Sequence, residues 1–216
     1  MTETELAALL RTWLSQDRGR MRALELAQQC AQMHTLPQWC LAAGFVRNLV
    51  WDKLHDIKQR PLNDIDLIYY CPLDTRPERD RAIEAYLHTL APDLPWSAKN
   101  QARMHLNNQD NPYQSTHDAM CYWPEQETAA AVYLEHMPNT VSSVVDNLQL
   151  IAPFGLSSLF ALQLTHNPKR ALAVFEQRIA TKNWLKQYPR LTLANDLGEL
   201  THFINMSSEV YFLLRC

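Results

Sequence analysis

The sequence predicts an α/β or α+β domain built around a modest sheet, and three observations lead to this class. Segments with helical spacing lie at both ends of the chain, while segments typical of strands alternate with helices between them. With 216 residues, the chain fits one large domain or a compact core with a helical appendage. An apolar fraction of 47% and a charged fraction of 20% are ordinary for a globular protein, so a core can be buried without metals or disulfides.

The first 35 residues are expected to form a helical packing segment. Apolar residues recur at helical spacing in Glu3–Trp13. A second helix is expected from about Met21 to Met33, with Asp17 as its cap. Neither helix carries a convincing catalytic group, so the chemistry is sought further along the chain.

Strands and helices alternate after this segment. The patterns predict, in order, a strand Gln38–Ala43 ended by Gly44, a helix Phe45–His55, a polar loop Asp56–Asn63, a strand Ile65–Cys71, a helix Pro77–Leu90 and a short strand Trp96–Ala98. There follow a turn-rich loop Asn107–Ser115, a helix capped by Ser115 or Thr116, a strand at the end of Glu127–Glu135, a strand Asn147–Ala152, a helix from Ser157 to Leu164 with Ser157 as its cap, and a long amphipathic helix Arg170–Tyr188. We expect one domain over residues 1–190 and a tail over residues 191–216, where no clear pattern is seen.

The composition excludes several classes of site. Four glycines are too few for a Gly-rich dinucleotide loop or a P-loop, and no Cys-x-x-Cys occurs among the five cysteines. Reduced thiols, together with acidic residues before the first apolar run, favour a cytoplasmic protein without a signal peptide. No apolar run approaches a membrane span, and a net charge of -3 argues against an extended nucleic-acid groove.

Asp64 and Asp66 are the candidate catalytic residues. On a strand, residues two apart face the same side, so the two carboxylates project together while Ile65 and Leu67 enter the core. Neighbouring carboxylates repel each other when both are ionised, and a cation between them relieves the repulsion. Because Mg²⁺ prefers oxygen ligands and such pairs serve in-line nucleotidyl transfer, we expect Mg²⁺ or Mn²⁺ here. The alternative is a solvated strand edge or a turn after Asn63.

Gly44 is the candidate phosphate cradle. A helix that begins directly after a strand aims free backbone N–H groups and its dipole at the space beyond the strand, which attracts phosphate. Arg47 and Asn48 lie in the first turn of this helix, and Arg47 suits bidentate phosphate binding. The competing interpretation of Arg47 is a surface ion pair with Asp52 or Asp56.

A dense polar run follows the strand at Trp96. Lys99, Asn100 and Arg103 would line a site that binds triphosphate or acceptor, or they would form an exposed helix face. Tryptophans such as Trp51 and Trp96 are expected in the core rather than as stacking platforms, because aromatic side chains bury large areas.

Long motifs give these residues a family context: Ala43–Asp52, Leu62–Leu67, Trp96–His105 and Ala152–Leu156. Over roughly residues 20 to 190, the chain resembles a bacterial nucleotidyltransferase-like family of the polymerase-beta-type superfamily. The resemblance implies a nucleotidyltransferase-type fold, a small mixed sheet flanked by helices with the aspartate pair on a central strand. It also implies transfer of a nucleoside monophosphate from a nucleoside triphosphate.

The chain departs from the superfamily pattern at identifiable positions. Phe45 follows the glycine where a small residue is usual, and Ser157 and Ser158 stand where members often carry aspartate. A third carboxylate normally lies on a neighbouring strand, where this chain offers Ser97. Its loss would weaken metal binding and remove the usual base for the acceptor hydroxyl, unless a residue such as Asp93 or Asp118 substitutes.

Two functions of different classes follow from these observations. The first is a metal-dependent nucleotidyltransferase that acts on a nucleoside triphosphate and a hydroxyl acceptor. The second is a catalytically degenerate nucleotide-binding or protein-interaction module of the same fold, motivated by Ser97. The sequence identifies neither the acceptor, nor the preferred base, nor the oligomeric state.

Overall fold

A computed structural model describes residues 1–58, 60–135 and 144–194. Its longer helices are α1 (Glu3–Gln16), α2 (Arg18–Met33), α3 (Gly44–Leu54), α4 (Pro77–Leu90) and α9 (Leu172–Lys182). Its short helices are α5 (His105–Asn108), α6 (Thr116–Met120), α7 (Val144–Asn147), α8 (Ser157–Phe160) and α10 (Trp184–Gln187), with 3-10 turns at Gln101–Arg103 and Gln126–Thr128. The strands are β1 (Cys40–Ala42), β2 (Ile65–Tyr69), β3 (Trp96–Asn100), β4 (Ala131–Leu134), β5 (Leu148–Ile151), β6 (Gln163–Leu164) and β7 (Thr192–Leu193).

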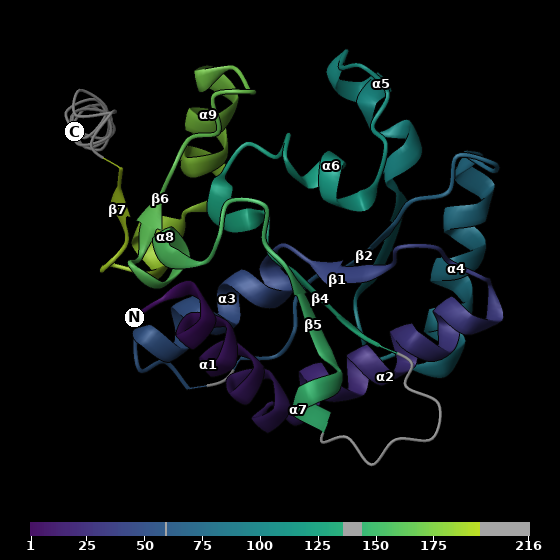
Figure 1. Cartoon of the computed structure of the whole chain (residues 1–216), viewed down its shortest axis with the longest axis horizontal. Helices are drawn as coiled ribbons and strands as arrows, with labels where there is room; N and C mark the ends of the chain where they lie inside the picture. The colour runs from purple at the N-terminus through teal and green to yellow at the C-terminus, as the bar shows by residue number, and fades with distance from the viewer. Residues whose placement is uncertain (59, 136–143, 195–216) are drawn as a thin grey trace, which may run out of the picture.

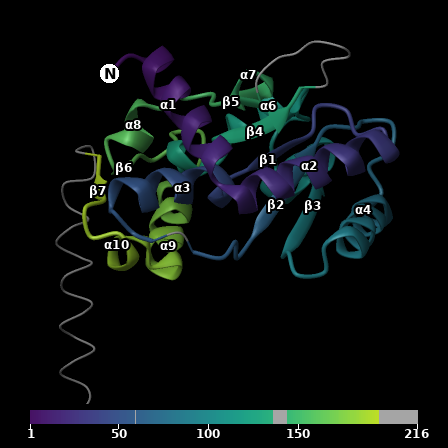
Figure 2. The same ribbon diagram turned by 90° about the horizontal axis from the view of Figure 1, so that it is seen from below.

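The central sheet is mixed, as the family resemblance implies. Five strands lie in the order β3-β2-β1-β4-β5, and only the β2–β3 pair is parallel (Figures 1 and 2). The helix α4 connects these two parallel strands and packs on β3. The strands β6 and β7 form a separate two-stranded parallel sheet near the C-terminal end of the described chain.

The two faces of the sheet are covered differently. Ile65, Leu67 and Leu41 point into the main core, which the helices α1 to α4 close from one side. On the opposite face, Ala42 and Ile68 belong to a smaller apolar cluster that includes Met120 of α6. Because side chains alternate along a strand, Asp66 lies on this second, less covered face.

Local rules explain the N-terminal helices. Thr2 and Glu5 form a capping box at the start of α1. Asp17 caps α2 by accepting a hydrogen bond from the Arg20 backbone N–H, as expected from the sequence. The helix α4 has the predicted bounds, with Pro77 in its first turn and acidic residues beside it.

Three expectations are wrong after residue 150. The helix predicted from Ser157 ends at Phe160, and the next residues form β6. Ser157 is not the cap, because Leu156 holds the N-cap position and the carboxylate of Glu3 accepts hydrogen bonds from the Leu156 and Ser157 backbone N–H groups. The long helix predicted over Arg170–Tyr188 is two helices, α9 and α10, because Asn183 between them adopts a left-handed conformation with φ 54°.

The predicted tail lies mostly outside the described residues, which end at 194 in this part of the chain. None of the helices within the described ranges combines the length and the apolar character that crossing a bilayer requires. Figure 2 shows the helices α9 and α10 on the same side of the molecule as α3.

Candidate active site

The two candidate aspartates lie at the start of β2. Asp66 pairs with Ala42 of β1 on one side and with Ser97 of β3 on the other. Its neighbours Ile65 and Leu67 are fully buried in the opposite face, which fixes the direction of the Asp66 side chain. Asp64 directly precedes the strand and is exposed.

Both aspartates line a cleft of about 170 Å³. The turn before α3 and its first residues form one wall, and α9 and α10 form the other. The lining residues are Ala43, Gly44, Arg47, Asn48, Asn63, Asp64, Asp66, Thr128, Arg178, Lys182, Trp184, Gln187 and Tyr188. The structure thus brings together the predicted Gly44, Arg47, Asn48 and the aspartate pair, although these residues come from separate segments of the chain.

The turn into α3 is tight and strained. Ala43, the N-cap residue, has a positive φ of 58°, a conformation that costs free energy for a residue with a Cβ. A Cβ at Gly44 would lie 3.2 Å from the Asn48 amide nitrogen and 3.6 Å from an Arg47 guanidinium nitrogen. Glycine therefore lets the backbone pass close under both side chains at the floor of the cleft.

Arg47 is a buried cation without a carboxylate partner among the described residues. Its guanidinium carbon lies 4.9 Å from the Trp51 ring centroid and 4.5 Å from that of Trp184. It donates hydrogen bonds to Thr128 Oγ1 at 2.7 Å and to Asn48 Oδ1 at 3.0 and 3.2 Å. Its side chain makes no ion pair within the described part of the chain. Burial lowers the pKa of Arg47 to about 10, so the group stays protonated at neutral pH.

The alternative reading of Arg47 as a surface residue paired with Asp52 or Asp56 is therefore wrong. Asp52 instead accepts a hydrogen bond from the Tyr188 hydroxyl at 3.0 Å and lies 3.7 Å from Arg60. Because Arg47 is only 6% exposed and lines the cleft, its charge is available to an anion there.

Asp66 has a raised pKa. Burial, and next to it the neighbouring charge of Asp64, raise the pKa of Asp66, which lies at about 6. Arg47, Lys182 and Lys99 act in the opposite sense. A bound divalent cation would relieve this repulsion, so the pair fits a metal that takes its other ligands from water and phosphate. Among the described residues, no cluster of three or more His, Cys, Asp or Glu side chains is arranged to hold a metal ion.

No third carboxylate lines this cleft among the residues that the structure describes. Ser97 lies directly beside Asp66 on β3, the position where an acid was sought. Of the two substitutes considered, Asp93 forms a surface ion pair with Arg22 at 2.6 Å, and Asp118 accepts a hydrogen bond from the Gln114 backbone. Neither of them reaches the cleft.

The polar run after Trp96 has other partners. Lys99 pairs with Glu84 at 3.3 Å, and Arg103 forms an ion pair with the buried Asp80. Asn100 is fully buried and hydrogen-bonds to the backbone of Cys71 and Asp74, where it holds the loop between β2 and α4. None of Lys99, Asn100 and Arg103 lines the cleft. Lys99 does lie on the same face of the sheet as Ser97 and Asp66.

The second wall of the cleft was not found from the sequence. The expectation of one helix over 170–188 concealed that Lys182 and Trp184 flank a break at Asn183. Asparagine tolerates the left-handed conformation that ends helices, so Asn183 was the available signal. Arg178, Gln187 and Tyr188 join the site through the same change in chain direction.

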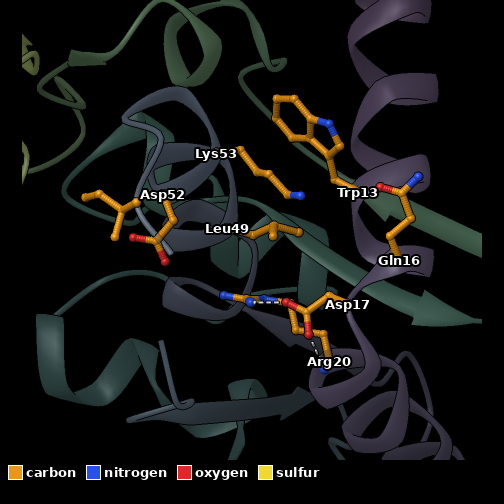
Figure 3. A pocket seen from close by; sticks show the side chains of 8 residues that line it. Trp13, Gln16, Asp17, Arg20, Leu49, Asp52 and Lys53 are labelled. Carbon is orange, nitrogen blue, oxygen red and sulfur yellow. Dashed lines mark hydrogen bonds and ion pairs between the residues drawn. The ribbon is translucent and has the colours of Figure 1, made fainter. Parts of the chain in front are cut away.

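The cleft continues past Asp64 into a polar recess lined by Arg20, Asp52 and Arg60 among others. A separate hollow of about 90 Å³ lies beyond it, between α1, α2 and α3 (Figure 3). There the buried Arg20 pairs with Asp17 at 2.5 Å and donates to the Phe45 carbonyl oxygen at 2.8 Å. Its charged groups thus hold α2 against the start of α3, so this hollow supports the candidate site rather than competing with it.

Comparison with known proteins shows the family of this chain. A family model described as nucleotidyltransferase matches residues 29–193, so the chain belongs to this nucleotidyltransferase family. No curated protein matches the chain.

Solved structures show the same fold. A protein whose NMR structure reveals a CCA-adding enzyme head domain is 26% identical, with a TM-score of 0.72 over 86% of this chain and 94% of that one. A CCA-adding enzyme in complex with CTP is 14% identical, with a TM-score of 0.56 over 95% of this chain and 47% of that one. A tRNA-processing enzyme complex is 15% identical, with a TM-score of 0.52 over 83% of this chain and 46% of that one. The chain thus spans about half the length of these two larger proteins, whose likeness concerns the fold.

Proposed function

We propose that this protein transfers a nucleoside monophosphate from a nucleoside triphosphate to a hydroxyl acceptor in the cleft in front of β2. The observation that carries the proposal is that one cleft holds both a buried arginine and a pair of carboxylates. The buried Arg47 has no carboxylate partner among the described residues, and the Asp64–Asp66 pair lies in the same lining. A polyphosphate would neutralise the charge of Arg47, and a divalent cation bound to that polyphosphate would neutralise the two carboxylates.

The residues have separate roles in this reaction. Gly44 and Asn48 shape the floor beside the N-terminus of α3, where Arg47 and backbone N–H groups would bind phosphate oxygens. Asp64 and Asp66 would hold Mg²⁺ or Mn²⁺, which supplies charge neutralisation at the phosphates when bound. The acceptor oxygen forms a bond to the α-phosphorus while the bond from that phosphorus to the bridging oxygen of the β-phosphate breaks. Pyrophosphate leaves, and the hydroxyl proton passes to a carboxylate of the pair or to water.

Of the polar run after Trp96, only Lys99 stays in the proposal. Its position on the face of Asp66 lets its charge act on the site at long range. Asn100 and Arg103 serve the fold through their buried partners.

One observation favours a second candidate function. With Ser97 beside Asp66, the cleft has two carboxylates, which is the arrangement expected of a module that binds nucleotide without transferring it. The two candidates differ in turnover and share the binding site, so a binding test comes first and a transfer test second.

The binding test uses thermal unfolding. ATP, GTP, CTP and UTP are added with Mg²⁺ or Mn²⁺ to wild type and to the Asp64→Ala/Asp66→Ala variant, because a ligand of the folded state raises the melting temperature. We expect a metal-dependent rise in wild type that the double variant loses. Pyrophosphate release with candidate hydroxyl acceptors then separates enzyme from binder. A well-folded wild type that shows no shift with any of the four nucleotides would refute both functions.

A further inference from the structure

The break between α9 and α10 places a lysine at the mouth of the candidate site. Lys182 is the last residue of α9, Asn183 turns the chain in the left-handed conformation, and Trp184 starts α10. Two residues apart on one regular helix would point in different directions, yet Lys182 and Trp184 both line the cleft. Figure 2 shows α9 and α10 side by side beneath α3.

The cations around the cleft differ in how they are balanced. Arg178 pairs with the fully buried Glu125 at 2.5 Å, which neutralises it. Arg47 has no ion pair in the part of the chain that the structure describes, but it is fixed, because two indole rings and two hydrogen-bonding side chains enclose its guanidinium. Lys182 is exposed and has no ion pair within the described ranges. It is therefore the cation that remains free to move toward a charged ligand.

The charge of a triphosphate exceeds what the rest of the lining offers. A cation held by Asp64 and Asp66 would be shared with the phosphates, and Arg47 supplies one further fixed charge. An ammonium group on a flexible stem, with three donors, can follow an oxygen that moves during the reaction. The leaving pyrophosphate is such a group, whereas the α-phosphate stays with the product.

We infer that Lys182 binds the terminal phosphates of the donor and then the pyrophosphate, and so makes the site select triphosphates over monophosphates. This inference rests on the proposed function, because it assigns a residue to the donor of that reaction. It predicts a contact that depends on the number of phosphates and is independent of the base.

The test compares four proteins by isothermal titration in the presence of Mg²⁺: wild type, Lys182→Gln, Lys182→Arg and Lys186→Gln. Lys186 is the matched control, since it is an exposed lysine on α10 that does not line the cleft. The probes are ATP, CTP, their monophosphates and inorganic tripolyphosphate. For Lys182→Gln we expect about tenfold weaker binding of both triphosphates and of tripolyphosphate, with monophosphate binding within about twofold of wild type. Lys182→Arg should recover most of the loss, and Lys186→Gln should behave as wild type.

The outcomes separate this inference from the proposed function. If wild type binds the triphosphates and Lys182→Gln binds them equally well, the role of Lys182 is refuted and the proposed function stands. The same holds if the variant loses triphosphate and monophosphate binding to the same extent, because that pattern reflects a damaged site. If wild type binds neither the nucleotides nor tripolyphosphate, both fail.

Discussion

The guanidinium carbon of Arg47 lies 4.5 Å from the centroid of the Trp184 ring. This contact joins α3, which follows β1, to α10, which forms part of the second wall of the cleft. Trp51 of α3 contacts the same cation at 4.9 Å, and the guanidinium carbon of Arg178 lies 5.8 Å from the centroid of the Trp184 ring. A buried arginine is thus kept in place by aromatic rings, which leaves its charge for a ligand instead of cancelling it.

We therefore expect Trp184→Ala to damage binding and stability together. Trp184 is 4% exposed, and truncation of a buried tryptophan costs about 3–5 kcal/mol of unfolding free energy. Nucleoside triphosphate binding should fall with it, because Arg47 loses one of its two ring contacts, while Trp184→Phe should retain most of both. Urea unfolding and titration with ATP measure the two effects. Trp39→Ala, at a half-buried tryptophan outside the cleft, is the control, and equal losses of binding in both alanine variants would contradict the argument.

Local patterns were sufficient for the part of the site near β2. Adjacent residues encode the strand, the glycine and the helix that starts at Gly44, and the alternation around Asp64 and Asp66 places both in one cleft. The family resemblance added the expectation of a mixed sheet, which the strand order confirms. The bounds of α4 were also predictable, because Pro77 marks its start and Pro92 and Pro95 follow its last residue, Leu90.

Long-range contacts determine what the sequence did not show. Asn100 and Arg103 look like exposed polar residues, and only their buried partners in the loop after β2 and in α4 reveal a structural role. The carboxylate of Glu3, which is distant in sequence, accepts hydrogen bonds from the backbone N–H groups at the start of α8. The prediction that Ser157 caps this helix was therefore wrong. The second wall of the cleft depended on a single backbone conformation at Asn183, which hydrophobic periodicity does not register.

Arg47→Met should separate binding from stability. The variant loses the buried, fixed charge that Arg47 offers to phosphate, so we expect at least tenfold weaker triphosphate binding. The unfolding free energy should stay within about 1 kcal/mol of wild type, because the variant also loses the cost of burying an unpaired charge and keeps an apolar contact with both rings. Chemical denaturation measures the unfolding free energy, and titration with ATP measures the loss of binding. A variant that unfolds far more easily yet binds ATP normally would show that Arg47 serves the fold alone.

Asp66→Asn should stabilise the metal-free protein at neutral pH. The folded pKa is raised to about 6 from an ordinary 3.8, so between these values the folded state keeps a proton that the unfolded chain has released. Stability therefore falls as the pH rises through this window. Two pKa units correspond to roughly 3 kcal/mol, and partial solvent access reduces the expected gain to about 1–2 kcal/mol.

Unfolding curves of wild type and Asp66→Asn at pH 7.5 and pH 4, with metal removed by a chelator, measure this gain. The difference should be present at pH 7.5 and vanish toward pH 4. Asp64→Asn, at an exposed position, should change stability less. Mg²⁺ with ATP should then stabilise wild type and not Asp66→Asn, which reverses their order. Identical metal-free curves at pH 7.5 would remove the electrostatic argument for a cation at this pair.

Glu3 is expected to secure the turn before α8 in a pH-dependent way. Its carboxylate accepts hydrogen bonds from the Leu156 backbone N–H at 2.8 Å, the Ser157 backbone N–H at 3.0 Å and the Ser157 hydroxyl at 2.5 Å. The hydrogen bond from the Ser157 hydroxyl is the main cause that lowers the pKa of Glu3 below its ordinary 4.5. A carboxylate whose pKa is lowered on folding stabilises the protein fully at pH values above its ordinary pKa. This stability is lost as the pH falls through the pKa of the folded state.

Glu3→Gln should therefore cost about 1 kcal/mol at pH 7, similar to the loss of a helix cap, and progressively less below pH 4.5. Gly155→Ala tests the same contact from the other side. Its φ is +75°, and an added Cβ would lie 3.0 Å from the Glu3 carboxylate, so it should destabilise by more than the cap alone. Because both changes act on one contact, the double variant should lose less than the sum of the two. Urea unfolding at pH 7 and pH 4 of both single variants, the double variant and Glu25→Gln, an exposed glutamate on α2, measures these differences. Strict additivity would mean that Gly155 is required for its backbone alone and that Glu3 acts elsewhere.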